Sequence, residues 1–326
     1  MLAGALSRAG LLRWPAGAAI VGLVILLAWG RLVELFGAER LVLAQAAVTG
    51  ILQGGIYALS AMGLTLIFGV LGVINFAHGA FVSVGLYLCY SFVAGLGINP
   101  YLSLPLVVVA SFLIGMAVYK AVLAPSIGQP HENQLLLTLA IAIVLENALK
   151  LIFSATPRFV QTDLAGLDLR LFGLSTPTTW VIAFFGAILL AGLLHALLQR
   201  TLLGASIRAV SSNRTGAIIV GIDVGQIYML VFGLGVACVG AAAVLVAPVL
   251  PIEPVAGERF TIVAFVVVVL GGLGNVFGAF MGGLLVGLAQ EIGGVFFPTQ
   301  SKLLAVFVVF IVVLFWRPQG LFGRAR

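Results

Sequence analysis

The chain has 326 residues, of which 62% are hydrophobic and only 8% are charged, with a formal net charge of +6 at pH 7. This composition, with a mean hydropathy of +1.26, excludes a water-soluble globule and indicates a protein that crosses a membrane several times. The apolar runs are continuous and long, so they predict helices rather than barrel strands of about ten alternating residues. We therefore expect an all-α fold, a polytopic transmembrane helical bundle.

The bundle is expected to have roughly eight to ten crossings within a single transmembrane domain over residues 1–326. The first run is interpreted as a true span and not as a cleaved signal, because no convincing small-residue cleavage site follows it. The predicted spans lie near residues 15–30, 43–70, 77–97, 101–124, 133–154, 179–199, 226–250, 259–275, 277–297 and 301–316.

A polar break at residues 75–79 interrupts the long apolar run between residues 41 and 97. It places Asn75 and His78 at membrane depth, where polar groups are costly. Two interpretations remain open. The two side chains cap a helix end and bond the adjoining backbone, or the broken segment lines a path for a polar solute.

A second glycine-rich break lies at residues 271–278, and residues 273–280 weakly echo residues 71–81. Paired interrupted segments in a transporter point to its pathway. Whether each break is a turn at the surface or a meeting of half-helices inside the bilayer is left open. The candidate path residues are Asn75, Phe76, His78, Gly79, Gly271, Gly272, Gly274 and Asn275.

Charged residues are rare in the predicted spans. Glu146 and Lys150 stand four residues apart on one helix and are expected to pair. Besides Glu146, only Glu291 is a carboxylate within a predicted span, and each lies toward a span end, so proton-driven transport lacks its usual groups. Glu258 and Arg259 are expected on the outer side.

The distribution of lysine and arginine favours an orientation with both termini in the cytoplasm. If all ten spans cross, the inner side holds nine of the 16 basic residues and the outer side holds the other seven. The longest basic loop, residues 200–225, then lies inside. Within it, Asn213 is expected to cap a short helix that carries Ile218 and Ile219 and that ends at Gly221. Such an amphipathic loop helix indicates a docking element.

Four ordered motifs resemble those of the permease subunits of high-affinity branched-chain amino acid ABC transporters, a family that includes urea, amide and aromatic acid permeases. The motifs are GIYAL at residues 55–59, GVINFAHG at 72–79, VLGGLG at 269–274 and RPQGLFG at 317–323. The basic loop is similar to the cytoplasmic coupling segment of the same family. The resemblance covers residues 41–323.

The resemblance implies a permease subunit of an ATP-driven importer for small solutes, with branched-chain or related amino acids as the expected cargo. It implies a bacterial inner membrane location and four kinds of partner: a homologous second permease in a heterodimer, two cytoplasmic ATPase subunits, a periplasmic solute-binding protein and the lipid bilayer. No nucleic acid is expected. The residues expected to couple to the ATPases are Arg208, Ser212, Asn213, Gly221 and Ile222.

The chain itself is not expected to be an enzyme or to bind a cofactor or a metal. It contains no GxxxxGK[ST] sequence that could cradle ATP, so ATP and Mg²⁺ are expected in the partner subunits. Its cysteines and histidines have no metal-like spacing.

Two departures from the family pattern bear on the cargo and the partners. Ala80 stands where the family often has an acidic residue, and Ser211 and Ser212 stand where it often has acids.

The alternative functions are a channel or a secondary carrier for a small polar solute such as urea or an organic acid.

Overall fold

The computed structural model describes residues 40–164, 166–171, 173–298 and 301–323. The expected span at residues 15–30 lies outside them. The described elements, in chain order, are α3 (Arg40–Leu71), α4 (His78–Leu96), η1 (Pro100–Ser103), α5 (Leu104–Val118), η2 (Tyr119–Leu123), η3 (Ala124–Ser126), α6 (His131–Phe153), β1 (Asp168–Leu171), β2 (Leu174–Pro177), α7 (Thr178–Arg200), α8 (Leu202–Ser212), α9 (Arg214–Ile219), α10 (Val224–Val246), α11 (Glu258–Gly271), α12 (Val276–Phe296) and α13 (Lys302–Trp316).

The prediction of an all-α membrane bundle is confirmed. In the described residues, seven helical segments are long and apolar enough to cross a membrane: Leu41–Leu71, His78–Leu96, Pro100–Ser126, Glu132–Phe153, Thr178–Arg200, Val224–Val246 and Val276–Phe296. Two further predicted spans are shorter helices, α11 with 14 residues and α13 with 15. The strands β1 and β2 form one small antiparallel hairpin, in which Asp168 pairs with Pro177.

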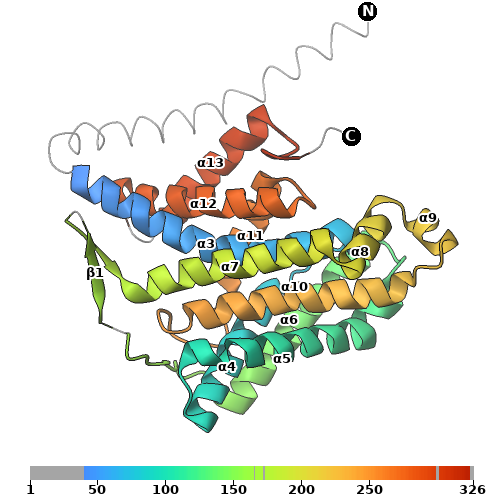
Figure 1. Ribbon diagram of the computed structural model, residues 1–326, viewed down its shortest axis with the longest axis horizontal. Helices are drawn as coiled ribbons and strands as arrows, with labels where there is room; N and C mark the ends of the chain where they lie inside the picture. Colours follow the sequence, from blue (N-terminus) through green and yellow to red (C-terminus); the bar gives the residue numbers. More distant parts are fainter. Residues whose placement is uncertain (1–39, 165, 172, 299–300, 324–326) are drawn as a thin grey trace, which may run out of the picture.

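Helices α3, α5, α7, α10 and α12 run along one axis of the molecule, whereas α4 and α6 are inclined to it (Figure 1). The short helices α8 and α9 lie at one end, which we call the coupling end, and the β1–β2 hairpin lies toward the other, which we call the hairpin end. The two ends give each helix a direction: α3 and α7 run toward the coupling end, whereas α10 starts there.

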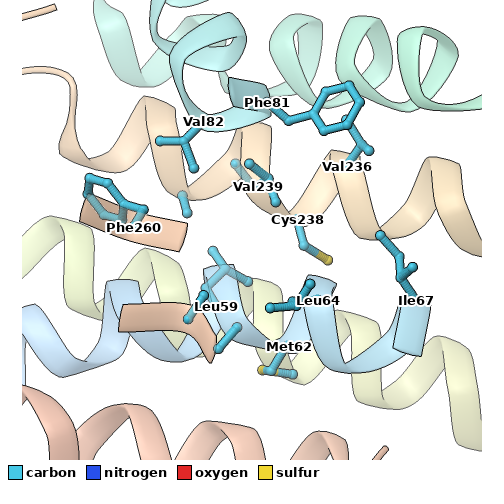
Figure 2. Packing of buried hydrophobic residues seen from close by; sticks show 14 of the residues in the cluster. Leu59, Met62, Leu64, Ile67, Phe81, Val82, Val236, Cys238, Val239 and Phe260 are labelled. Carbon is cyan, nitrogen blue, oxygen red and sulfur yellow. The ribbon is translucent and has the colours of Figure 1, made fainter. Parts of the chain in front are cut away.

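The core lies between α3, α4 and α10. Figure 2 shows Leu59 and Ile67 of α3, Phe81 of α4, and Val236 and Val239 of α10 packed together, all of them buried. Large apolar side chains on α6 and α7 are instead exposed on the bundle surface. Because lipid tails are as apolar as these side chains, their exposure is what a membrane environment permits.

Glycines bring α3 and α12 into close contact. A Cβ atom added to Gly50 or Gly54 of α3 would lie 2.8 Å from the carbonyl oxygen of Gly287 or Gly283, respectively. Helices in a membrane associate through such small residues, since apolar burial gives little driving force there. Gly283 and Gly287, four residues apart on α12, thus allow the backbone of α3 to approach closely.

A depth scale follows from α10, which has 23 residues and is about 34 Å long at 1.5 Å per residue. Its central residue, Gly235, packs directly against Gly63 of α3. We call this level mid-depth. A span of this length crosses a bilayer core of about 30 Å, so mid-depth corresponds to its middle.

Candidate functional site

The first break starts a helix at mid-depth. Helix α3 continues to Leu71 at the coupling end, where the Ser211 hydroxyl of α8 donates to the Gly69 carbonyl at 2.7 Å. Residues 72–77 then return along α3, and α4 begins at His78, whose Nε2 lies 2.9 Å from Ser60 Oγ. Ser60 is 11 residues before the end of α3 (71 − 60), about 17 Å along the helix and one turn from Gly63.

Asn75 and His78 are both buried, and they bond different partners. Asn75 Oδ1 accepts the backbone N–H of Ala77 at 3.1 Å, so Asn75 stabilises the turn that precedes α4. The His78 ring bonds a different helix: Nε2 is bonded to Ser60, and Nδ1 is buried with no hydrogen-bond partner among the described residues. Asn75 thus bonds the adjoining backbone as expected but does not cap α4, whose N-cap residue is Ala77, whereas His78 attaches the start of α4 to α3.

Phe76 is the exposed residue of this break, at 41% exposure. Its ring packs against Phe265 of α11, with the centroids 5.3 Å apart. Thr138 of α6 holds the backbone on both sides of Asn75, accepting from Phe76 N at 3.2 Å and donating to the Ile74 carbonyl at 3.3 Å. The break is therefore fixed by three helices, and it presents an aromatic pair on the surface of the chain.

Helix α11 also begins at mid-depth, directly against the start of α4. The backbone N–H of Gly79 donates to Thr261 Oγ1 of α11 at 2.9 Å, and the N–H of Gly257 donates to Ser83 Oγ of α4 at 3.0 Å. Each helix start thus receives a side-chain cap from the other helix. The sequence analysis did not identify Gly257. The available signal was its position directly before Glu258 and Arg259, the charged pair that precedes the apolar run of α11.

The second break lies at the coupling end and not at mid-depth. Helix α11 ends at Gly271, and Gly272 and Gly274 adopt positive φ values of 97° and 80° that L side chains rarely adopt. Gly274 packs against Gly69, and Asn275 Oδ1 caps α12 by accepting from Gly278 N at 3.0 Å. This break is a tight turn between two helices.

The last described residues cover this turn. Leu321 N donates to the Leu270 carbonyl at 2.7 Å, and Asn275 Nδ2 donates to the Phe322 carbonyl at 2.8 Å. The structure thus brings Asn75, Phe76, His78 and Gly79 together at the first break and Gly271, Gly272, Gly274 and Asn275 at the second. It does not join the two groups into one mid-depth site.

The expected helix in the coupling segment is present as α9. Asn213 Oδ1 accepts from Gly216 N at 2.9 Å, and Asn213 is the N-cap of α9. At the other end, Gly221 has a φ of 85°, and Ile222 N donates to the Ala217 carbonyl at 2.9 Å. This closure by a left-handed residue is a common C-terminal cap, so the predicted start and stop are confirmed.

The coupling segment presents both charge and apolar surface. Arg208, Ser212, Asn213 and Gly221 are exposed, Ile222 is half-buried, and Ile219 has 79% of its surface exposed. The guanidinium of Arg214 lies over the Tyr228 ring, 5.8 Å from its centroid, which attaches α9 to α10. Through Ser211 and Gly69 the segment also contacts the end of α3.

The prediction that Glu146 and Lys150 pair is wrong. The one ion pair in the described part of the chain joins Lys302 Nζ to Glu291 Oε1 at 3.1 Å. Lys150 is exposed near the end of α6, and an exposed pair gains little from holding two long side chains in one geometry.

The expected outer position of Glu258 and Arg259 is also wrong. Both residues belong to the first turn of α11, which starts at mid-depth against Gly79. The chain between α10 and α11 returns into the bundle before α11 starts. The apolar run at residues 259–275 has the length of an ordinary span, so its sequence did not indicate that the helix begins inside the bundle.

Ala80 is 3% exposed and packs within the apolar core. The residue at this position therefore contacts other core side chains in this chain.

Comparison with a family model and with individual known proteins points to the same family. The family described as branched-chain amino acid transport system / permease component matches residues 46–315. The chain is 31% identical over 295 residues to the high-affinity branched-chain amino acid transport system permease protein BraD of Pseudomonas aeruginosa, with 86% of this chain and 95% of BraD covered.

Similar relatives occur in two further organisms. The LivH permease protein of Escherichia coli is 27% identical, with 86% of this chain and 95% of LivH covered. A probable branched-chain amino acid transport permease of Methanocaldococcus jannaschii is 30% identical, with 87% and 93% covered. No solved structure matched the chain significantly.

Proposed function

The chain belongs to the family of permease components of branched-chain amino acid transport systems, and we propose that it is the transmembrane subunit of an ATP-driven importer of branched-chain or related amino acids. The names of its relatives support this cargo. Its multi-pass helical bundle supports the transmembrane role. The proposed location is a bacterial inner membrane, with both termini in the cytoplasm.

The proposed importer contains a homologous second permease, two cytoplasmic ATPase subunits and a periplasmic solute-binding protein. The chain has no sequence that could form a phosphate-binding loop, so ATP hydrolysis is assigned to the partner subunits. Because the binding protein would select the solute, the permease needs no tight site of its own. A ligand shifts the equilibrium between two conformations only through its different affinity for them.

The observation that carries the proposal is the exposed, capped helix α9. It is held in shape by Asn213 at its start and by Gly221 after its end, and it presents Ile218 and Ile219 to the outside at the coupling end. Exposed apolar side chains on a rigid helix are typical of a docking surface. The proposed ATPase contacts are Arg208, Ser212, Asn213, Gly221 and Ile222.

In the proposed mechanism, movement of the ATPase subunits pushes α8 and α9. The push reaches α3 through the Ser211–Gly69 hydrogen bond, and the second break contacts the same residue through Gly274. The proposed path passes the first break at Asn75, Phe76, His78 and Gly79. On this path, Gly271, Gly272, Gly274 and Asn275 lie toward the cytoplasmic exit.

Co-purification with the ATPase subunits tests the proposal. We expect the ATPase to be recovered with the unaltered chain from membranes and to be lost when Ile219 is replaced by aspartate. Phe159→Asp is the matched control, because Phe159 is an exposed apolar residue that follows α6, away from the coupling end. Failure to recover any ATPase with the unaltered chain, or solute uptake without nucleotide, would overturn the proposal.

A further inference from the structure

Two charged side chains lie at mid-depth on the surface of this chain. Glu258 and Arg259 open α11, and both are exposed. Their depth follows from the hydrogen bond between Thr261, one turn further along α11, and the backbone of Gly79. Within the part of the chain that the structure describes, neither side chain forms an ion pair.

The exposure of these charges identifies the environment of this face. An ionisable side chain in the middle of a bilayer is costly against lipid and almost always faces the protein interior or a water-filled cavity. The exposed side chains of α7, by contrast, include Phe185, Leu189 and Leu193, which lipid can cover. The α11 face is therefore turned away from lipid, toward a hydrated space.

Polar groups continue from Arg259 onto α3 and α12. Arg259 lies within electrostatic range of the Tyr57 hydroxyl. Tyr57 is hydrogen-bonded to Gln290 at 3.1 Å, and Gln290 Nε2 also reaches Gln53 Oε1 at 3.5 Å. Gln53 and Gln290 are partly exposed, so they add hydrogen-bonding groups to the surface of α3 and α12.

Glu258 faces a different neighbour. It lies within electrostatic range of Glu146 on α6, a half-buried carboxylate that Lys150 also approaches. The start of α11 therefore carries one charge of each sign, with Glu258 within range of α6 and Arg259 within range of α3, where Glu291 of α12 also acts on Tyr57. A free α-amino acid carries the complementary pair of charges, one ammonium and one carboxylate.

An apolar strip leads from this charged pair toward the coupling end. Ile262 is exposed one turn after Glu258, and Phe265 follows in contact with Phe76. Residues at these spacings lie on one side of a helix. The strip offers a surface to an aliphatic side chain whose polar end is held at Glu258 and Arg259.

We propose that Glu258 and Arg259 form a transient contact site for a zwitterionic amino acid, with Glu258 facing the ammonium group and Arg259 the carboxylate. The inference rests on the proposed function and deepens it by assigning the residues that contact the charged groups of the amino acid. A neutral solute such as urea carries neither charge, and an aromatic acid carries only one. Two opposite charges at mid-depth therefore favour the zwitterion over the other solutes that related permeases carry.

The test uses the complete complex in proteoliposomes, supplied with binding protein saturated with L-leucine so that delivery does not limit the rate. We expect Glu258→Gln and Arg259→Gln each to lower ATP-driven leucine uptake about tenfold, since each removes a charged hydrogen-bonding partner. Glu258→Asp and Arg259→Lys, which keep the charge, should retain most of the uptake. Recovery of the partner subunits should not change in any of the four variants.

Glu253→Gln and Arg170→Gln are the matched controls. Glu253 precedes α11 and Arg170 lies in β1, so both are outside the mid-depth region. Uptake within about twofold of the unaltered complex in both test variants would overturn the inference. So would loss of the partner subunits, which would assign the two charges to assembly. If the unaltered complex instead transports urea or benzoate and not leucine, the zwitterion assignment fails while the importer remains; if it transports nothing with ATP, the proposed function fails.

Discussion

Gly79 and Gly257 place two helix starts in direct backbone contact at mid-depth. A Cβ atom on either glycine would collide with the carbonyl oxygen of the other. The N–H of Gly79 is bonded to Thr261, and the N–H of Gly257 is bonded to Ser83, so each helix caps the other. This junction satisfies free backbone donors at a depth where no lipid group could do so.

Replacing Gly257 by alanine tests how tightly the junction is packed. The backbone of Gly257 has a φ of −74° and a ψ of −18°, which alanine adopts readily, so the expected effect is purely steric. We expect a loss of about 1–3 kcal/mol in the free energy of unfolding, because the methyl group has no room against Gly79. Thermal unfolding of the detergent-solubilised protein measures it.

Gly95→Ala is the control for that substitution. Gly95 is a helical residue of α4 with nothing within 4 Å of an added Cβ atom. Alanine is a better helix former than glycine, so this variant should be as stable as the unaltered protein or slightly more so. Equal stability of the two variants would contradict the close packing at Gly257.

The two hydroxyl caps of the junction give a second prediction. Thr261→Val keeps the side-chain shape but leaves the Gly79 N–H without its acceptor, and we expect a loss of about 1–3 kcal/mol in stability. Ser83→Ala should act similarly at Gly257. Thr261→Ser, which retains the hydroxyl, should remain close to the unaltered protein. If valine and serine at this position give the same unfolding temperature, the hydroxyl does not stabilise the junction.

The local features of the structure are those that the sequence could predict. Continuous apolar runs gave the long helices, because a span needs about 20 such residues wherever it lies. The ends of α9 followed from Asn213 and Gly221, because an N-cap side chain and a left-handed glycine act within a few residues of themselves. No tertiary contact was needed for either.

The mid-depth junction could not be predicted in the same way. It joins Gly79 to Gly257, which are 178 residues apart in the chain (257 − 79), and hydropathy does not distinguish a helix that starts at the surface from one that starts inside. The same limitation placed Glu258 and Arg259 on the wrong level. The segment at residues 273–280, which weakly resembles residues 71–81 in sequence, belongs to a turn at the coupling end and not to the mid-depth junction.

A third prediction concerns the cap of α9. Asn213→Ala removes the acceptor of Gly216 N, and loss of an N-cap costs about 1 kcal/mol, enough to destabilise a helix of six residues. We expect weaker recovery of the ATPase subunits and a lower rate of ATP-driven uptake. Asn213→Ser keeps a capping hydroxyl and serves as the control. If alanine and serine behave alike, the cap does not support docking.

A fourth prediction separates docking from transmission. Ser211 donates to the Gly69 carbonyl, so Ser211→Ala removes this side-chain hydrogen bond between α8 and the end of α3. We expect the ATPase subunits to be recovered normally, with less solute transported for each ATP hydrolysed. Ser206→Ala is the matched control, because the Ser206 hydroxyl donates to the Leu202 carbonyl within α8 and, in the described part of the chain, makes no hydrogen bond to α3. An equal ratio of transport to hydrolysis in both variants would contradict a role of Ser211 in transmission.

The aromatic pair Phe76–Phe265 gives the last prediction. These rings lie on the surface between the mid-depth charges and the coupling end, and Phe76 is fixed by Thr138. On the proposed path they would form an apolar barrier that resists the passage of water and polar solutes between transport cycles. Phe76→Ala should therefore raise the leak of labelled leucine from proteoliposomes without nucleotide, and Phe185→Ala, which alters an exposed ring on α7, should not. A leak that is unchanged in Phe76→Ala, in a complex that still takes up leucine with ATP, would place the barrier elsewhere.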